Sequence, residues 1–214
     1  IENLSFLEGY NVYSFDRRQL DISDRDKISR VLSSLPKVKY WINCAAYTKV
    51  DDAEKNAHEA NLYNAIAPGH IADACKEAGV HLFDFFFFFV YHNDLRRLLK
   101  DTDPTEPNGE LAIAGSGASH TILRTSWVYG PGGHNFVNTM LRLAKTKTHL
   151  RIVGDQLGAP TFTFDIVEAV KSMIHLDIAG HRNDINGIFN FANSGEVTWD
   201  DFARMIFKLS RANC

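Results

Sequence analysis

Hydrophobic and polar positions in the first part of the chain follow two alternating periods. Short apolar runs are separated by stretches in which apolar residues recur every three or four positions. Strands and helices that alternate at this spacing predict βαβ units and a mostly parallel sheet. The expected strands are residues 11–15, 38–43, 80–91 and 121–128, and the expected helices are residues 24–35 and 57–79.

The ends of these helices carry residues that commonly start or stop a helix. Ser23 precedes the first helix and is the expected N-cap, because its hydroxyl can accept a backbone N–H bond in the first turn. Pro36 ends that helix, and Gly79 closes the second. Both helices therefore have defined lengths, and residues at the carboxyl ends of the strands become the candidates for ligand contact.

The pattern changes in the second part of the chain. Helices are expected at 136–144, 163–175 and 198–209, and strands at 150–153 and 188–192. Thr198 and Asp201 fit a capping box, and Phe202, Ile206 and Leu209 would form the apolar face of the last helix. The predicted fold class is a doubly wound, Rossmann-like α/β domain with a smaller α/β substrate lobe. Residues 1–130 would form the dinucleotide-binding domain and 131–214 mainly the lobe, with 163–177 packing back on the first domain.

Composition narrows the classes of function. The 214 residues are 45% hydrophobic and 23% charged, with a net charge of −3. No basic stripe indicates nucleic acid, and no apolar run reaches the ~18 residues that a membrane span needs. Three widely spaced cysteines, Cys44, Cys75 and Cys214, favour reduced thiols in the cytoplasm and give no metal-binding cluster. Ile1, Leu4 and Leu7 are spaced like one helix face, so we expect the chain to start inside a helix.

Polar and small residues follow several of the predicted strands. Asp16-Arg17-Arg18 could hold the ribose and 2′-phosphate of a dinucleotide or form a solvated turn. The small residues of 43–48 would let a flat cofactor approach the backbone, although such turns are common. Trp127 is either a substrate wall, with its ring partly exposed, or a core residue. The loop 155–161 is either part of a ligand cleft or a simple turn.

Six stretches, in order along the chain, resemble the extended short-chain dehydrogenase/reductase superfamily, and within it the dTDP-4-dehydrorhamnose reductases. They read LDISDRDKI, INCAAYTKVDDAE, RTSWVYG, GHNFVNTMLRLAK, DQLGAPT and FNFANSGEVTWDDFA. The resemblance implies a cytoplasmic enzyme of nucleotide-sugar and cell-surface polysaccharide biosynthesis. It would reduce dTDP-4-dehydro-L-rhamnose, a dTDP-4-keto-6-deoxy sugar, to dTDP-L-rhamnose with NADPH, or with NADH in its place. It also allows a homodimer and implies no nucleic acid, membrane or metal.

The resemblance also assigns roles by position. The cofactor-binding residues would be Asp16, Arg17, Asp21, Ile22, Ala45, Ala46, Tyr47, Thr48 and Asn64. The substrate-binding residues would be Trp127, Asn135, Gln156 and Pro160.

The chain departs from the family pattern at three places. The Gly-rich phosphate loop, which should precede the opening helix, is absent. Phe86–Phe89 stand where the family has Ser-Thr-Asp-Tyr, which puts Phe87 at the Thr position. Asn108 and Ala112 stand at the catalytic Tyr and Lys, so no catalytic residue is intact. We expect the Phe run, Phe85–Phe89, to lie in the strand that pairs with the one ending at residue 43, and to overpack the core.

Two interpretations explain these departures. The chain is a catalytically inactive family member that serves as a regulatory or binding subunit, like that of methionine adenosyltransferase. Alternatively, the sequence is incomplete and differs from the natural one at residues 85–89 and 108–117. The phenylalanine run, the missing start and the shortened stretch 116–119 favour the second interpretation.

Overall fold

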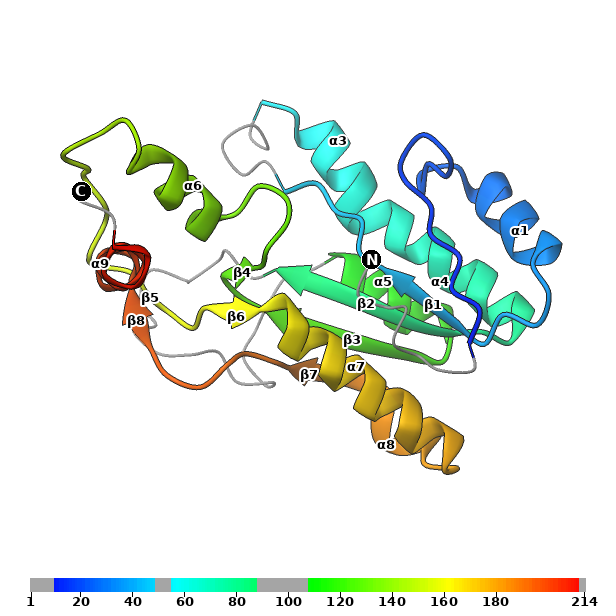
Figure 1. Cartoon of the computed structure of the whole chain (residues 1–214). Helices are drawn as coiled ribbons and strands as arrows, with labels where there is room; N and C mark the ends of the chain where they lie inside the picture. The colour runs from blue at the N-terminus through cyan, green and yellow to red at the C-terminus, as the bar shows by residue number, and fades with distance from the viewer. Residues whose placement is uncertain (1–9, 49–54, 88–107, 212–214) are drawn as a thin grey trace. The chain divides into compact units, whose positions relative to one another are not determined.

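The computed structural model describes residues 10–48, 55–87 and 108–211 of the chain (Figure 1). The described residues form two compact units that alternate along the sequence. The first unit takes residues 10–48, 55–86, 108–123 and 176–189, and the second takes residue 87 and residues 124–175 and 190–211. The predicted domain boundary after residue 130 stays a prediction.

A four-stranded sheet forms the centre of the first unit, with strand order β1-β2-β3-β7 (Figure 1). Its strands are β1 Tyr40–Asn43, β2 His81–Phe87, β3 His120–Thr125 and β7 Gly187–Asn190. β1 and β2 run parallel, with Asn43 opposite Asp84. The predicted α/β fold class with a parallel sheet is therefore confirmed. The described part of the phenylalanine run lies in β2, between β1 and β3, as expected.

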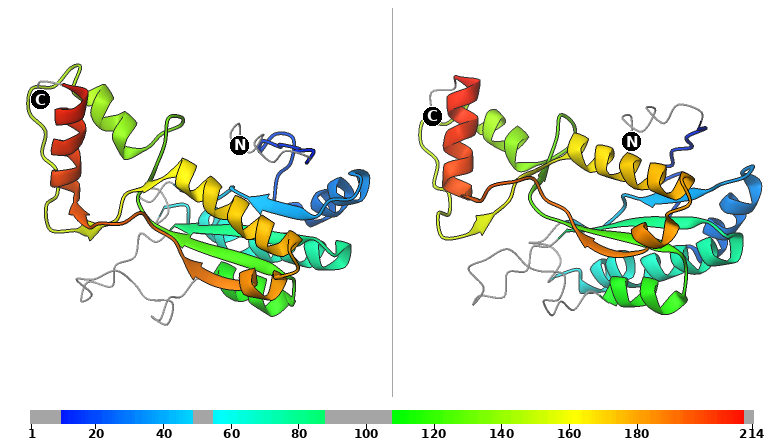
Figure 2. Two further views of the ribbon diagram at one scale, coloured as in Figure 1. Left: turned by 60° about the horizontal axis from the view of Figure 1, so that its bottom comes forward. Right: turned by 90° about the horizontal axis from the view of Figure 1, so that it is seen from below.

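The helices of the first unit include α4 and α5, which lie on one face of the sheet (Figure 2). Its helices are α1 Arg25–Ser34, α3 Ala57–Asn61, the π-helix η2 Leu62–Ile66, α4 Ala67–Ala78, α5 Asn108–Ser116 and α8 Arg182–Ile185. Gly79 adopts φ 67° and ends α4 as predicted, because a left-handed backbone suits glycine. The expected N-cap of α1 is wrong: Asp24 accepts the Lys27 N–H, while Ser23 bonds Asp21.

The π-helix η2 has a cause in the sequence. The carbonyl of Asn64 would normally accept the N–H of residue 68, four positions later, but residue 68 is Pro68 and has no N–H. The helix is therefore widened over Leu62–Ile66 before α4 continues. π-turns of this kind occur frequently at functional sites, because they release backbone groups from the helical ladder.

The hydrophobic core of the first unit joins α1, α4, α5 and the first strands. Its most buried members, all 0% exposed, are Ile28, Ala67, Ile71, Ala72, Cys75, Leu82, Ile113 and Ile122. Phe86 packs against this core from β2, so one ring of the phenylalanine run is accommodated there. An ion pair between Arg25 and Asp73, 3.2 Å long, links α1 to α4 at the surface.

The second unit contains short strands and amphipathic helices. They are β4 Val128–Tyr129, β5 Leu157–Gly158, β6 Thr161–Phe162, β8 Val197–Thr198, α6 Phe136–Leu143, α7 Thr163–Ile178 and α9 Trp199–Ser210. β4 pairs with β6 in parallel, and β5 pairs with β8 antiparallel. Residues 163–175 of α7 belong to this unit and 176–178 to the first. The predicted cap of α9 is confirmed, because Thr198 accepts the Asp201 N–H.

Three further sequence expectations about local structure are wrong. Residues 11–15 form no strand, and Val12, Tyr13 and Phe15 are 36–46% exposed, because no neighbouring strand pairs with them among the described residues. Residues 150–153 form no strand either; Leu150 and Ile152 instead pack on the α6–α9 core. Leu209 is 76% exposed, so the apolar face of α9 ends at Ile206.

Among the described residues, no helix is both long and apolar enough to cross a membrane. The same part of the chain holds no group of three or more His, Cys, Asp or Glu side chains that could bind a metal ion.

Candidate functional site

The predicted ribose-binding residue Asp16 forms a tight turn. Its carboxylate accepts the backbone N–H groups of Arg18 and Gln19, each at 2.9 Å. The Gln19 side chain in turn accepts the Asp16 N–H at 2.9 Å. These bonds fix the backbone of the turn, on which Arg17 and Arg18 are both exposed residues.

Arg17 and Asp21 are joined through Tyr63. The Arg17 guanidinium donates to the Tyr63 hydroxyl at 2.8 Å and lies over its ring, 4.5 Å from the centroid. The Tyr63 hydroxyl donates to the Asp21 carboxylate at 3.0 Å. Partial burial raises the pKa of Asp21, but bonds from Ser23 and Tyr63 outweigh it and hold that pKa below its ordinary value. The structure thus brings two predicted cofactor residues together, and Tyr63 was missed because a helical tyrosine gives no signal in the sequence.

The loop after β1 is tied to the π-helix. The Tyr47 N–H donates to the Asn64 side chain at 2.7 Å, and the Asn64 amide donates back to the Tyr47 carbonyl at 3.0 Å. The Ala45 N–H donates to the Asn43 side chain at 3.1 Å. Ala46 is half-buried and Thr48 is exposed in the same loop, whereas Ile22 is a core residue. Asn64 therefore fixes the backbone of the predicted cofactor loop.

A buried carboxyl lies beneath that loop. Asp84 is 2% exposed and accepts a 2.9 Å bond from the Asn43 amide. Burial raises its pKa to about 7, the nearby Glu110 carboxylate adds to the rise, and the bonds from Asn43 and the Phe85 N–H oppose it. A carboxyl whose pKa lies near neutrality is a common feature of functional sites, although structural networks produce it too. Sequence reasoning passed over Asp84 because it precedes the phenylalanine run.

The three predicted catalytic positions lie on β2 and α5. Phe87 is the last residue of β2, and Asn108 is the exposed first residue of α5. Ala112 faces α4, because a Cβ built on Gly69 would lie 3.1 Å from the Ala112 Cβ. Gly69 therefore lets α4 and α5 approach each other closely at Ala112. A Cβ on Gly109 would overlap the Asn64 carbonyl, so α5 begins in close contact with the π-helix.

Trp127 occupies an unusual backbone conformation in the second unit. Its φ is +48°, which is rare for a bulky residue. The carbonyl of Trp127 accepts the Thr161 N–H at 3.2 Å, and the neighbouring Ser126 hydroxyl donates to the Ala159 carbonyl at 3.1 Å. The expectation of a partly exposed ring is wrong: Trp127 is 7% exposed, because Trp199 and Gly158 cover its ring.

Trp199 contacts two of the predicted substrate residues, Trp127 and Gln156. Its indole stacks on Trp127 with ring centroids 3.5 Å apart and planes at 11°. Its Nε1–H donates to the Gln156 side chain at 3.2 Å, and the Phe136 ring lies 4.4 Å away. Sequence reasoning missed Trp199, although it lies inside one of the quoted stretches, because it reads there as the first residue of a helix.

The remaining predicted substrate residues shape the loops beside this stack. Asn135 caps α6 and donates to the Gly130 and Gly132 carbonyls at 2.9 and 3.1 Å. Pro160 is half-buried next to Ala159. Thr125 ends β3; its hydroxyl is buried and has no hydrogen-bond partner within the described residues. A ligand hydroxyl or water would satisfy it.

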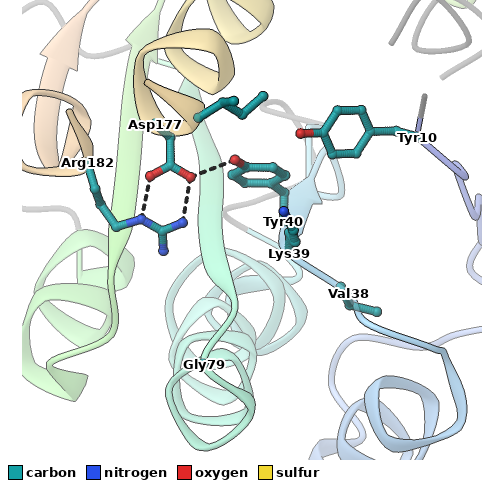
Figure 3. A pocket seen from close by; sticks show the side chains of 8 residues that line it. Tyr10, Val38, Lys39, Tyr40, Gly79, Asp177 and Arg182 are labelled. Carbon is teal, nitrogen blue, oxygen red and sulfur yellow. Dashed lines mark hydrogen bonds and ion pairs between the residues drawn. The ribbon is translucent and has the colours of Figure 1, made fainter. Parts of the chain in front are cut away.

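A cavity of about 390 Å³ lies at the other end of the sheet (Figure 3). It is lined by Tyr10, Val38, Lys39, Tyr40, Gly79, Asp177, Ile178 and Arg182. Tyr40 begins β1 and Gly79 precedes β2, so the cavity is at the amino ends of these strands. Asp177 accepts from Arg182 at 2.6 Å and from the Tyr40 hydroxyl at 2.6 Å. This cavity contains no predicted site residue, and three of its polar lining residues, Tyr40, Asp177 and Arg182, are bonded to one another.

Comparisons with known proteins agree with this arrangement. The sequence profile of the RmlD substrate binding domain matches residues 2–214. The dTDP-4-dehydrorhamnose reductase of Sinorhizobium fredii is 34% identical over 208 residues, which cover 92% of this chain and 70% of that protein. The spore coat polysaccharide biosynthesis protein SpsK of Bacillus subtilis is 34% identical over 211 residues, 94% and 71% of the two chains. The crystal structure of dTDP-4-dehydrorhamnose reductase from Bacillus anthracis in complex with NADP has a TM-score of 0.90 and 31% identity, and the match covers 99% of this chain and 78% of that one.

Proposed function

The chain belongs to the family of the RmlD substrate binding domain, and on that premise we propose that it serves the NADPH-dependent reduction of dTDP-4-dehydro-L-rhamnose to dTDP-L-rhamnose. The observation that carries this proposal is the likeness, over nearly the whole chain, to a reductase crystallised with NADP. The family relationship makes the chain a nucleotide-sugar reductase by descent.

The described residues of the first unit fit a cofactor with a 2′-phosphate. Arg17 uses one guanidinium nitrogen for Glu59 and Tyr63, and its side chain is 65% exposed. Arg18 is exposed on the same turn. Asp16 is occupied with backbone N–H groups, so two cations and a shielded carboxylate face an incoming phosphate. This arrangement favours NADPH over NADH.

The loop at 45–48 would take the neighbouring part of the cofactor. Asn64 holds that loop through both the N–H and the carbonyl of Tyr47, so the approach of a flat ring would require no backbone rearrangement. Bound NADPH supplies a hydride. The protein has to orient the two ligands, exclude water and deliver a proton to the 4-keto oxygen of the sugar.

The second unit would hold the sugar nucleotide. Trp127, Gln156 and Phe136, the residue after Asn135, all contact Trp199, which supports the assignment of Trp127, Asn135 and Gln156 to one binding surface. The buried Thr125 hydroxyl at the end of β3 adds an unsatisfied polar group to the same unit. A hexose with several hydroxyls can use such groups, and flat rings commonly contact the apolar faces of sugars and bases.

The sequence lacks the expected proton donor. Asn108 has no acidic proton to give and Ala112 carries no charge, so neither can act as the phenol or the ammonium expected at these positions. Phe87 supplies no hydroxyl. We therefore expect the chain with these residues to bind both ligands and to turn over slowly.

Calorimetric titration with NADP⁺ and with dTDP, followed by an assay of NADPH oxidation, tests the proposal. We expect both ligands to bind, and NADPH to be consumed only when dTDP-4-dehydro-L-rhamnose is present. Binding of both ligands with no oxidation at all would instead favour the regulatory or binding subunit. Failure to bind either ligand would contradict the proposal.

We also propose a cytoplasmic location, where NADPH and nucleotide sugars are made, and a homodimer as the state to test. Light scattering coupled to gel filtration measures the mass of the assembly directly.

A further inference from the structure

The Trp127–Trp199 stack has a geometry that packing alone does not require. Aromatic pairs in protein cores usually meet edge-to-face or offset, at centroid distances of ~4.5–7 Å. Here the centroids are 3.5 Å apart and the planes are nearly parallel at 11°. Trp199 therefore covers one face of the Trp127 indole and Gly158 lies against the same ring, so the 7% of Trp127 that stays exposed is the part left for contact with a ligand.

Several contacts hold Trp127 in this position. Its backbone has a φ of +48°, a conformation that persists in a bulky residue only when its surroundings enforce it. The Thr161 N–H binds the Trp127 carbonyl. Gly158 lies against the ring so closely that any Cβ there would overlap it. The strained conformation is thus fixed by a strand, a glycine and a second indole.

Trp199 is itself held at two points. Its Nε1–H donates to the exposed Gln156 side chain at 3.2 Å. Trp199 is also the first residue of α9, directly after the N-cap Thr198, so its backbone is part of that helix. Because α9 packs on α6 through Ala203, Ile206 and Met140, the indole is attached to the packed core of the second unit.

We propose that Trp199 is a positioning residue that fixes the Trp127 ring, through stacking and through Gln156, in the orientation that receives the sugar nucleotide. This inference rests on the proposed function, since it assumes that Trp127 contacts the sugar nucleotide. Trp199 would act without touching the ligand itself. Gln156 would then contribute by holding Trp199 as well as by any contact of its own.

Two variants and one control separate this role from a purely structural one. Trp199→Phe keeps an aromatic ring on Trp127 but loses the bond to Gln156, and Trp199→Leu loses both. The chain has three tryptophans, so Trp41→Phe on β1 of the first unit removes an indole without touching the pair. Gln156→Leu, at an exposed position, provides a mild variant that is expected to fold if Trp199→Leu does not.

The first measurement is spectroscopic and needs no ligand. Two indoles stacked this closely couple their electronic transitions, which produces a paired positive and negative band in circular dichroism. We expect this signal in the starting protein and in Trp41→Phe, and its loss in Trp199→Leu. Its presence in Trp199→Leu, or its absence from the starting protein, would overturn the inference.

The second measurement is the dissociation constant for dTDP. We expect Trp199→Leu to weaken dTDP binding about 5- to 10-fold, the scale of one lost aromatic pair, with Trp199→Phe and Gln156→Leu in between. Unchanged dTDP affinity in Trp199→Leu, with binding intact in the starting protein, would overturn this inference and leave the proposed function standing. No dTDP binding by the starting protein would overturn both.

Discussion

The two compact units form their candidate sites from opposite kinds of contact. In the first unit, directed polar pairs fix the backbone: Asn43 with Asp84, Asn64 with Tyr47, and Tyr63 with Asp21. In the second unit, stacked rings around Trp199 fix flat surfaces. Directed bonds depend on protonation and charge, whereas stacking depends on shape and volume. The first region should therefore respond to pH and to loss of charge, and the second to truncation of a ring.

The largest effect is expected from Trp127→Ala. The ring is 7% exposed and stacked on Trp199, so its removal leaves a cavity in the second unit. Truncation of a buried tryptophan costs about 3–5 kcal/mol of unfolding free energy. The variant should lose that much in denaturant unfolding while the pH dependence of stability stays as it was.

Trp41→Ala is the matched comparison for this variant, because Trp41 is half-buried on β1 of the other unit. Its loss of stability should be smaller. A change below about 1 kcal/mol in Trp127→Ala would show that the stack is not a stabilising feature.

The next effect concerns the buried carboxyl of the first unit. The folded pKa of Asp84 is raised from 3.8 to about 7. A raised pKa contributes stability that is complete below pH ~4 and is lost as the pH rises through about 7, because the folded state holds the proton more tightly. Asp84→Asn keeps a side-chain oxygen that can accept from Asn43 but cannot ionise, so it avoids the loss of stability at high pH. It should be more stable than the starting protein by about 2–4 kcal/mol at pH 8.

Denaturant unfolding of Asp84→Asn at several pH values checks this expectation. The gain should vanish toward pH ~4, the unfolded pKa of the carboxyl. A variant that is less stable at pH 8 than the starting protein would show that the ionised carboxyl is preferred, and so that a bound cation or another donor satisfies it.

His81, the first residue of the same strand, should titrate in the opposite sense. It is 0% exposed, and Ser119 and Thr121 contact its two ring nitrogens at 2.7 and 2.8 Å. The Thr121 hydroxyl donates to the Ile185 carbonyl, so it must accept from His81 Nε2–H. The Ser119 hydroxyl lies 2.7 Å from Nδ1 and 3.4 Å from the side-chain oxygen of Asn186, and either atom can accept its proton.

Burial lowers the pKa of His81 from 6.5 to about 4, the positive charge of Arg182 adds to the shift, and so does the nearby His120, while Asp177 opposes it. A lowered histidine pKa contributes stability that is complete above pH ~6.5 and lost as the pH falls through about 4. His81→Gln, a neutral replacement, should therefore become relatively more stable on acidification, by about 1–3 kcal/mol between pH ~7 and ~4. The same slope in His81→Gln and the starting protein would mean that the histidine is not buried neutral.

Much of the fold was predictable from the sequence. Gly79 marks the end of α4 and Pro68 explains the π-helix, because both residues impose local backbone conditions that no partner can change. The strand at 11–15 could not be predicted correctly, because a strand exists only with a neighbour and the sequence does not show whether one is present. The predicted strand at 150–153 was wrong for a similar reason, because Leu150 and Ile152 pack on α6 and α9 and do not pair with a strand.

Some residues of the candidate site could likewise be predicted from the sequence, and others could not. Trp127 was proposed because it follows β3, near a strand end where ligand contacts concentrate, whereas Asp16 and Arg17 were proposed because they follow residues 11–15, which form no strand. Trp199 and Tyr63 were not found, since each acts through a partner far away in the sequence. The burial of the Trp127 ring was missed for that reason, because it is Trp199 that covers it.

The smallest of the expected effects tests the charge-dependent half of the comparison. Arg17 and Arg18 are exposed on the turn that Asp16 closes, and their cations can meet the 2′-phosphate that distinguishes NADPH from NADH. Arg17→Ala/Arg18→Ala should weaken NADP⁺ binding about 10-fold, or about 1.4 kcal/mol, and leave NAD⁺ binding nearly unchanged. The loss should shrink at high salt, since exposed charges are screened.

Arg25→Ala is the matched control, because it removes an exposed arginine that pairs with Asp73 on α4, away from the turn. Titration calorimetry with both nucleotides measures the difference directly. Equal losses for NADP⁺ and NAD⁺ would mean that the two arginines support the turn and do not read the phosphate, and the first unit would then select its cofactor by shape, as the second unit is expected to select its sugar.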